Sequence, residues 1–163
     1  GYLVDILLDL GYDAYGVDAS TSGISLANKR HPNRFFFYDI DSLSIPSELI
    51  NKQIDTIISL EVVEHIYTPN NFMKSCDLFL AKNKKGEVMI STPYHGYFKN
   101  LILAISGKMD NHFTVLWEGG HIKFWSKKTL TILIEKFGYT FKNFIGCGRL
   151  PFLWKSMLIV CEK

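Results

Sequence analysis

The chain has 163 residues, 47% of them hydrophobic and 14% aromatic, which is enough apolar material for one domain with a sizeable core. A formal net charge of +2 is too small to indicate a nucleic-acid-binding surface, although the predicted turn at 82–85 carries three lysines. Three cysteines without metal-binding spacing, the lack of a membrane-length apolar run and the lack of a signal peptide favour the cytoplasm.

The first third of the chain alternates helical and strand-like patterns. Apolar residues at helical spacing stop at Gly11, and Ser20 or Thr21 can cap a second helix before Pro32 breaks it. The apolar runs between and after them are short and rich in aromatic or β-branched residues, which is typical of strands. The expected elements are a helix over 2–10, a strand over 14–18, a helix over 20–30, and strands over 34–38 and 54–59.

The rest of the chain continues this alternation around one irregular stretch. Asn70 can cap one helix, and Ser126 can cap another that Gly138 ends. Residues 94–118 lack a clean period, although a helix fits 97–105, so we expect an insertion or lid there. The other expected elements are a helix over 70–80, a strand over 87–92, a helix over 126–137, and strands over 140–144 and 157–161.

Helices that alternate with short buried strands predict an α/β fold with right-handed crossovers. The final strand pair suits an antiparallel hairpin, so the sheet should be mixed but mostly parallel. We expect a single domain over 1–163 that begins in the middle of its architecture, because helical periodicity starts directly after Gly1. Functional residues should lie at the carboxyl ends of the strands, where such sheets bind ligands.

Two acids follow expected strands of the first third. Asp18 lies 17 positions after Gly1, near the spacing at which nucleotide-binding folds place an acid on ribose hydroxyls. A turn acid that caps the next helix explains Asp18 equally well. Asp39, followed by Ile40, can offer a carboxylate and a backbone N–H to adenine. Asp41 is an alternative to Asp39, and a merely polar strand end explains both.

A cluster of acids and a histidine follows the strand over 54–59. If a helical turn begins there, Glu61, Glu64 and His65 lie on one helix face, at the carboxyl end of the strand. Two carboxylates and an imidazole suit Mg²⁺, Mn²⁺ or Zn²⁺, and the imidazole can also act as a general base. Alternatively, acids are simply favoured at a helix N-terminus and His65 is packed.

This order of features resembles the class I S-adenosylmethionine-dependent methyltransferases, especially the branch with ubiquinone-type O-methyltransferases and small-RNA 2′-O-methyltransferases. The resemblance covers nearly the whole chain, and Glu-Val-Val-Glu-His after a strand is its most specific motif. The matching segments are Gly-Val-Asp-Ala-Ser at 16–20, Tyr-Asp-Ile at 38–40, the run at 54–65, Ser-Thr-Pro-Tyr at 91–94, and Gly-His-Ile-Lys-Phe-Trp-Ser at 120–126.

The resemblance implies a Rossmann-like methyltransferase sheet whose first strand and glycine loop would precede Gly1, which matches the last glycine of that loop. It implies that an acid after one strand binds the ribose, an acid after the next binds adenine, and the backbone after 54–58 binds the methionine end. The residues thus implied to bind S-adenosylmethionine are Gly1, Asp18, Ala19, Asp39, Ile40, Ser59, Leu60 and Glu61.

In the RNA-modifying branch, the Glu-x-x-Glu-His motif and a later His bind a divalent ion, and here these positions are Glu61, Glu64, His65 and His121. A hydroxyl bound to such an ion loses its proton more easily and can attack the sulfonium methyl. Otherwise His65 or His121, assisted by Glu64, would be the catalytic base. His121 is explained equally well by a structural turn after Gly119.

The activity that the resemblance implies is methyl transfer to an acceptor, most simply a hydroxyl oxygen of a small or lipid-like molecule. The apolar and aromatic residues of 94–118 favour such an acceptor, and residues 97–105 suggest a peripheral membrane contact, although core packing also explains them. Nucleic acid is not the expected partner. The alternatives are an NAD-dependent dehydrogenase or epimerase, which would not need the Glu and His set, and a noncatalytic methyltransferase-like module.

Overall fold

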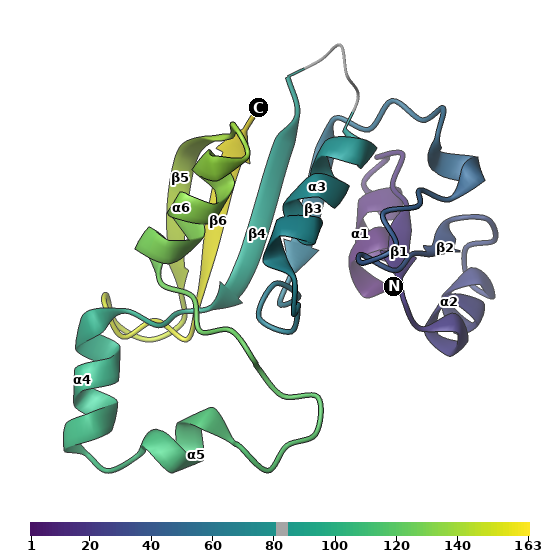
Figure 1. Ribbon diagram of the computed structural model, residues 1–163. Coiled ribbons are helices and arrows are strands. Elements are labelled where there is room, and N and C mark those ends of the chain that lie inside the picture. Colours follow the sequence, from purple (N-terminus) through teal and green to yellow (C-terminus); the bar gives the residue numbers. More distant parts are fainter. Residues whose placement is uncertain (81–84) are drawn as a thin grey trace. The chain divides into compact units, whose positions relative to one another are not determined.

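The structure is a computed structural model that describes residues 1–80 and 85–163 (Figure 1). The chain divides into two compact units, Gly1–Lys52 and Gln53–Lys163, and each has a sheet of its own. The single domain expected over the whole chain therefore stays a prediction. Lys82 and Lys84 of the expected lysine-rich turn lie outside the described residues.

The first unit contains two parallel strands and the helices beside them. Its small core forms where Val4 and Ala27, from two helices, pack on Phe35 of a strand. The strands pair with Asp18 opposite Phe37, so both run toward the same edge. The elements are α1 (Tyr2–Asp9), β1 (Gly16–Asp18), α2 (Thr21–Asn28), β2 (Phe35–Phe37) and the 3-10 helix η1 (Ser47–Leu49).

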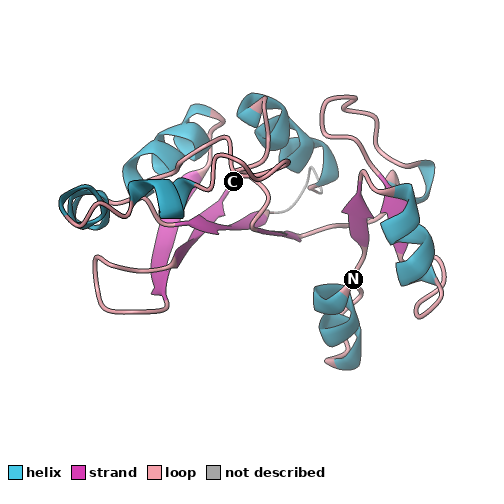
Figure 2. Ribbon diagram, turned by 90° about the horizontal axis from the view of Figure 1, so that it is seen from below, coloured by secondary structure: helices cyan, strands magenta, loops and turns pink. Residues whose placement is uncertain are grey.

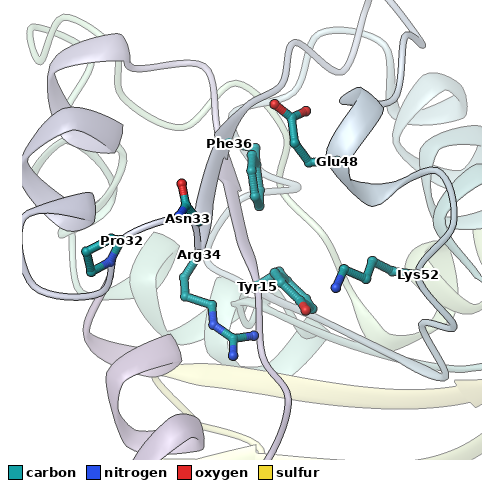
Figure 3. Close-up of a pocket in the computed structure, with 7 residues that line it drawn as sticks. All are labelled: Tyr15, Pro32, Asn33, Arg34, Phe36, Glu48 and Lys52. Carbon is teal, nitrogen blue, oxygen red and sulfur yellow. The ribbon is translucent and has the colours of Figure 1, made fainter.

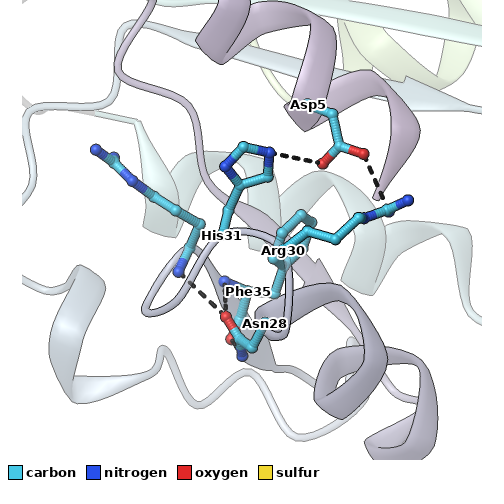
Figure 4. Close-up of polar contacts among 6 residues, drawn as sticks. Asp5, Asn28, Arg30, His31 and Phe35 are labelled. Atoms are coloured by element: carbon cyan, nitrogen blue, oxygen red, sulfur yellow. Dashed lines mark hydrogen bonds and ion pairs between the residues drawn. The ribbon is translucent and has the colours of Figure 1, made fainter.

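Local signals in the sequence set the helix ends of the first unit. Gly11 has a φ of +86°, which lets the chain leave α1 in the left-handed conformation as predicted. The Ser20 hydroxyl accepts a hydrogen bond from the backbone N–H of Gly23 at 3.1 Å and caps α2. Asp5 of α1 forms an ion pair of 3.0 Å with Arg30, just beyond α2 (Figure 4), and so links the two helices.

Two glycines of the first unit lie against the Phe35 ring. A Cβ atom at Gly1 would lie 2.8 Å from Phe35 Cζ, and one at Gly16 would lie 2.6 Å from Phe35 Cδ1. Both distances are shorter than carbon atoms tolerate, so close packing explains why glycine occupies each position. The cofactor contact expected of Gly1 stays a prediction.

The second unit contains the larger sheet, with strand order β3-β4-β6-β5. β3 and β4 are parallel, whereas β6 runs antiparallel to both β4 and β5, which confirms the mixed sheet with its C-terminal hairpin. The elements are β3 (Thr56–Leu60), α3 (Pro69–Phe79), β4 (Glu87–Pro93), α4 (Tyr97–Ile105), α5 (Met109–Phe113), α6 (Lys127–Lys136), β5 (Thr140–Cys147) and β6 (Ser156–Glu162).

The sheet of the second unit has two different faces. The inner face carries the fully buried side chains of β4 and β6, and α3 and α6 lie on the same side of the sheet (Figure 2). The alternate residues are half-buried and form the outer face, which includes Ser91 and Ser156. The inner-face residues of β4 and β6 are Val88, Ile90, Thr92, Met157, Ile159 and Cys161.

The predicted elements are all present, with boundaries that differ by three residues or fewer, but two details were wrong or missed. Thr68, not Asn70, is the N-cap of α3, because Pro69 fits the first helical position with its fixed φ. The short helix α5 within 94–118 was not predicted, since five residues show no apolar period. None of the helices over 1–80 and 85–163 has the length and apolar character that a bilayer-spanning segment requires.

Candidate functional site

The two acids of the first unit lie side by side at the carboxyl ends of β1 and β2. The backbone N–H of Tyr38 donates to the carbonyl of Asp18 at 2.9 Å, and Asp39 follows directly. One oxygen of each carboxylate is used locally: Asp18 accepts from Ser20 N at 2.7 Å, and Asp39 accepts from Asp41 N at 2.9 Å. Both acids remain exposed. Their turn contacts are therefore observed, and their ribose and adenine roles stay predictions.

A hollow of about 480 Å³ lies at the other ends of these strands (Figure 3). Tyr15 precedes β1 and Arg34 precedes β2, and the Arg34 guanidinium carbon lies 4.8 Å from the centroid of the Tyr15 ring. Arg34 also forms an ion pair with Asp13, and this hydrogen bond lowers the pKa of the Asp13 carboxyl. The residues that line the hollow include none of the expected cofactor ligands. It therefore lies away from Asp18 and Asp39, the acids at the opposite ends of the same two strands.

The segment after β3 is a turn, so the prediction of a helical turn there is wrong. Glu61 has a φ of +53°, in the left-handed region, which an α-helix of L-residues cannot contain. A tight turn follows Glu61, and in it the backbone N–H of His65 donates to the carbonyl of Val62 at 2.9 Å. Glu61, Glu64 and His65 consequently do not share one helix face.

Glu61 is fixed by two serines of neighbouring strands. Its Oε1 atom accepts hydrogen bonds from Ser91 Oγ at 2.8 Å and from Ser156 Oγ at 2.6 Å. The backbone N–H of Glu61 also donates to the carbonyl of Ser91 at 3.1 Å, which extends the β3–β4 ladder by one bond. Glu61 is thereby attached to the outer face of the sheet, where both serines lie.

Glu64 lies on the inner side and is completely buried, with 0% exposure. Its Oε2 atom accepts a hydrogen bond from Thr92 Oγ1 at 3.0 Å, whereas Oε1 is buried with no hydrogen-bond partner among the described residues. Burial raises the pKa of the Glu64 carboxyl. Because Ser91 and Thr92 are consecutive in a strand, they point to opposite faces, and so the two glutamates are on different sides of the sheet.

Two histidines join Glu64 to form a group with the composition of a metal site. One ligand atom each from Glu64, His65 and His121 lie within 4.8 Å of one another, and the two imidazole rings are 4.9 Å apart. The segment after His121 is attached to Glu64, whose carbonyl accepts from Ile122 N at 2.9 Å and Lys123 N at 3.0 Å. Burial, and then the neighbouring His65, lower the pKa of His121, which favours the neutral imidazole that binds metals. Glu61, the fourth expected ligand, is not in this group.

Residues that were not predicted complete the surroundings of this group. Trp117 lies near both histidines, with ring centroids 6.3 Å from His65 and 5.8 Å from His121. Trp125 Nε1 donates to the carbonyl of Val63 at 3.2 Å and so supports the turn that contains Glu64 and His65. Ser59 and Leu60, which were expected to contact the methionine end of the cofactor, adjoin this site at the end of β3. Ser59 is buried on the inner face, and Leu60 is exposed.

The insertion over 94–118 starts with buried basic residues and then exposes apolar ones. His95 is 7% exposed, and burial followed by the charge of Lys99 lowers its pKa to about 4. Lys99 is also buried, and its Nζ donates to the carbonyl of Tyr94 at 2.7 Å. The exposed apolar side chains of the insertion are Tyr97, Phe98, Leu101, Ile102, Ile105, Met109, Val115, Leu116 and Trp117.

The expected site residues are thus brought together in part. Glu64, His65 and His121 form one group, Asp18 and Asp39 form another, and Glu61 is separate from the first. The two pairs of strand ends belong to different units. A common rim for Asp18, Asp39 and Glu61 therefore stays a prediction.

Comparisons with known proteins agree with the motifs and the fold. The methyltransferase domain family matches residues 1–142. A ubiquinone biosynthesis O-methyltransferase of Bradyrhizobium diazoefficiens is 30% identical over 107 residues, which cover 66% of this chain and 41% of that protein. One from Dinoroseobacter shibae is 27% identical over 145 residues, or 85% of this chain and 55% of that protein. The chain spans about half the length of these relatives.

Solved structures show the same fold. The crystal structure of an S-adenosylmethionine dependent methyltransferase from Mesorhizobium loti matches with a TM-score of 0.71 and 12% identity, over 100% of this chain and 86% of that chain. At this identity the likeness concerns the fold alone, and it agrees with the mixed sheet described above. Because the family match covers most of the sequence, this chain belongs to the methyltransferase domain family, of the class I S-adenosylmethionine-dependent type.

Proposed function

We propose that the protein transfers a methyl group from S-adenosylmethionine to a hydroxyl oxygen of a small or lipid-like acceptor. The proposal rests chiefly on one observation, the buried Glu64 carboxylate beside two imidazoles at the carboxyl end of β3. The relatives at 30% and 27% identity are named O-methyltransferases, which supports an oxygen acceptor. Family membership favours this activity over the NAD-dependent alternative.

The cofactor would lie along the carboxyl ends of the strands. Asp18 and Asp39 each keep one carboxylate oxygen free of the local turn bonds, and these oxygens can accept from ribose hydroxyls and the adenine amine. Ala19 and Ile40, which follow these acids, would place backbone groups against the nucleoside. The methionine end would adjoin Ser59 and Leu60 at the end of β3.

A divalent ion such as Mn²⁺ or Zn²⁺ fits the group of Glu64, His65 and His121 better than Mg²⁺, which prefers oxygen ligands. The donor atoms of this group are one carboxylate oxygen and two imidazole nitrogens. Oε1 of Glu64, which has no hydrogen-bond partner within 1–80 and 85–163, is a buried acceptor that needs a cation or a proton. Three protein ligands would leave coordination positions for an acceptor hydroxyl. When bound, the ion would lower the pKa of that hydroxyl.

The residues of the chain also supply acid–base chemistry. Without an ion in the group, a neutral His121 would instead accept the proton of an acceptor hydroxyl, and the adjacent buried Glu64 would stabilise the imidazolium that results. His65, whose ring lies 4.9 Å from that of His121, would orient it or take the same role. The hydroxyl oxygen would then attack the sulfonium methyl group, with S-adenosylhomocysteine as the leaving product.

The insertion would recognise the apolar part of the acceptor. Its exposed aliphatic and aromatic residues, among them Tyr97 at 74% exposure and Leu116 at 95%, form a surface that prefers an apolar contact. We extend the proposal to a peripheral lipid contact through 97–105, where the acceptor could be collected. A cytoplasmic location and a non-nucleic-acid acceptor are part of the same proposal.

The test is methyl transfer from radiolabelled S-adenosylmethionine to an alkyl-substituted catechol, with the full-length protein. We expect label in the catechol, loss of transfer with a chelator, and recovery with Mg²⁺ or Mn²⁺. His121→Asn should reduce transfer by about 100-fold or more, as expected for loss of a general base, whereas the control His31→Asn in the first unit should not. Indifference to the chelator would remove the ion from the proposal, and cofactor binding without transfer to any hydroxyl acceptor would favour a noncatalytic module.

A further inference from the structure

The two glutamates of the motif are attached to opposite faces of one strand. Glu61 bonds to Ser91, and Glu64 bonds to Thr92, the next residue of β4. In the β4–β6 ladder Pro93 pairs with Ser156, so Ser156 lies on the same face as Ser91 and Pro93. Glu61 is therefore held on the outer face by serines of two strands, while Glu64 is buried on the inner face.

The arrangement of Glu61 is specific and has a conformational cost. A non-glycine residue at a φ of +53° is maintained only where its surroundings require it. Here the backbone N–H of Glu61 lies 3.1 Å from both the carbonyl and the hydroxyl oxygen of Ser91, and Oε1 receives both serine hydroxyls. Among the described residues no donor forms a hydrogen bond with Oε2. One carboxylate oxygen is fixed, and the other is free for a ligand.

We propose that Ser91 and Ser156 are positioning residues that hold Glu61 for the cofactor, and that Glu61 is not a ligand of the ion site formed by Glu64, His65 and His121. This inference rests on the proposed function. A fixed carboxylate with a free oxygen matches a cationic group, and the methionine end of S-adenosylmethionine carries an ammonium group. In the motif Glu-Val-Val-Glu-His, the first glutamate would thus serve S-adenosylmethionine and the second would serve the divalent ion.

The position of Ser156 makes it the more informative of the two serines. It is the first residue of β6, 95 positions from Glu61, and its hydroxyl lies 2.6 Å from Glu61 Oε1 and 2.9 Å from the carbonyl of Thr92. A hydroxyl can donate one hydrogen bond, and the ionised carboxylate is the stronger acceptor at the shorter distance. The Ser156 hydroxyl therefore donates to Glu61 rather than to Thr92. Removing this hydroxyl frees Glu61 without changing the ion group.

The experiment is a double-mutant cycle of Ser156→Ala and Glu61→Ala in the full-length protein, with S-adenosylhomocysteine binding measured by calorimetry. Ser156→Ala alone should weaken binding by about 10- to 15-fold, the lower end of the range for loss of a hydrogen bond to a charged group. In the Glu61→Ala background the same change should have an effect below about 2-fold, because the residue through which Ser156 acts is gone. Ser106→Ala is the matched control, since that exposed hydroxyl at the end of α4 donates locally, to the carbonyl of Leu103.

A second measurement separates the two ligands. Mn²⁺ binding followed by electron paramagnetic resonance should stay within about 2-fold in Ser156→Ala and Glu61→Ala, and should be lost in Glu64→Gln. Loss of Mn²⁺ binding in Glu61→Ala, additive effects in the cycle, or a Ser156→Ala affinity equal to that of the Ser106→Ala control would each overturn this inference alone. A wild-type protein that binds no S-adenosylhomocysteine would overturn the proposed function and this inference with it.

Discussion

The expected ligand acids Asp18 and Asp39 of the first unit and Glu64 of the second unit have very different surroundings. Asp18 and Asp39 are exposed, and each uses one oxygen to stabilise a local turn. Glu64 is completely buried, has one oxygen without a hydrogen-bond partner in the described parts of the chain, and has a raised pKa because of its burial. The exposed acids cost the fold little, whereas the buried acid is destabilising unless something compensates for its lost hydration.

This difference teaches where stability and function oppose each other in this protein. An exposed turn acid has a structural explanation that is sufficient without any ligand. A buried carboxylate with an unused oxygen has no such explanation, because the Thr92 hydroxyl satisfies only Oε2. The second unit should therefore respond to ligand-site substitutions in both stability and binding, and the first unit mainly in binding.

The largest effect is expected for Glu64→Gln. The amide keeps the shape and the bond to Thr92 but removes the buried charge, so divalent-ion affinity should fall by about 100-fold or more. In the absence of the ion the urea midpoint should stay the same or rise, since a desolvated charge has been removed. Titration with Mn²⁺ and urea denaturation measure the two quantities. A lower midpoint with unchanged ion affinity would show that Glu64 is structural and would break the comparison.

A smaller effect is expected for Asp18→Ala in the first unit. Loss of a carboxylate that accepts from ribose hydroxyls should weaken S-adenosylhomocysteine binding by about 10- to 100-fold, the range for hydrogen bonds to a charged group. Asp13→Ala is a matched control, because that acid pairs with Arg34 at the other end of the strands. Calorimetry with both variants gives the answer. Equal affinities would leave Asp18 only its turn bond to Ser20.

Much of this arrangement was predictable from the sequence because local signals decide it. Gly11 and Ser20 define helix ends through backbone conformation and capping, and both behave as the sequence suggested. The alternating patterns also predicted the succession of strands along the chain and the antiparallel pair at its end. The motif at 61–65 was correctly placed at the end of a strand, but the expected burial of that strand was wrong, because only Ser59 of β3 is buried.

The grouping of the motif's side chains was not predictable by the same reasoning. The helical spacing of Glu61 and Glu64 suggested a shared face, but the left-handed Glu61 and the alternation of Ser91 and Thr92 separate them. Ser156 gave no signal at all, because its contact with Glu61 exists only after β6 pairs with β4. Pairing between strands that are distant in sequence therefore decides which acids share a ligand.

A further way to sharpen the comparison is the pH dependence of the second unit. Burial followed by the charge of Lys99 lowers the pKa of His95 to about 4 from the ordinary value of 6.5. Between pH 6.5 and pH 4 the imidazole of His95 is therefore protonated in the unfolded chain but neutral in the folded protein. The contribution of His95 to the unfolding free energy is consequently complete above pH 6.5 and is lost as the pH falls toward 4. The slope from this residue is at most about 1.4 kcal/mol per pH unit.

His95→Leu should remove that slope. The wild type should therefore lose unfolding free energy relative to His95→Leu as the pH falls from 6.5 to 4. Urea denaturation followed by tryptophan fluorescence measures it directly in the second unit, because Trp117, Trp125 and Trp154 are the three tryptophans of the chain. His31→Leu, which changes a histidine of the first unit, is the control that should leave this slope unchanged. Parallel pH profiles for the wild type and His95→Leu would mean that the histidine ionises without hindrance, and the second unit would then not differ from the first in the cost of its buried charges.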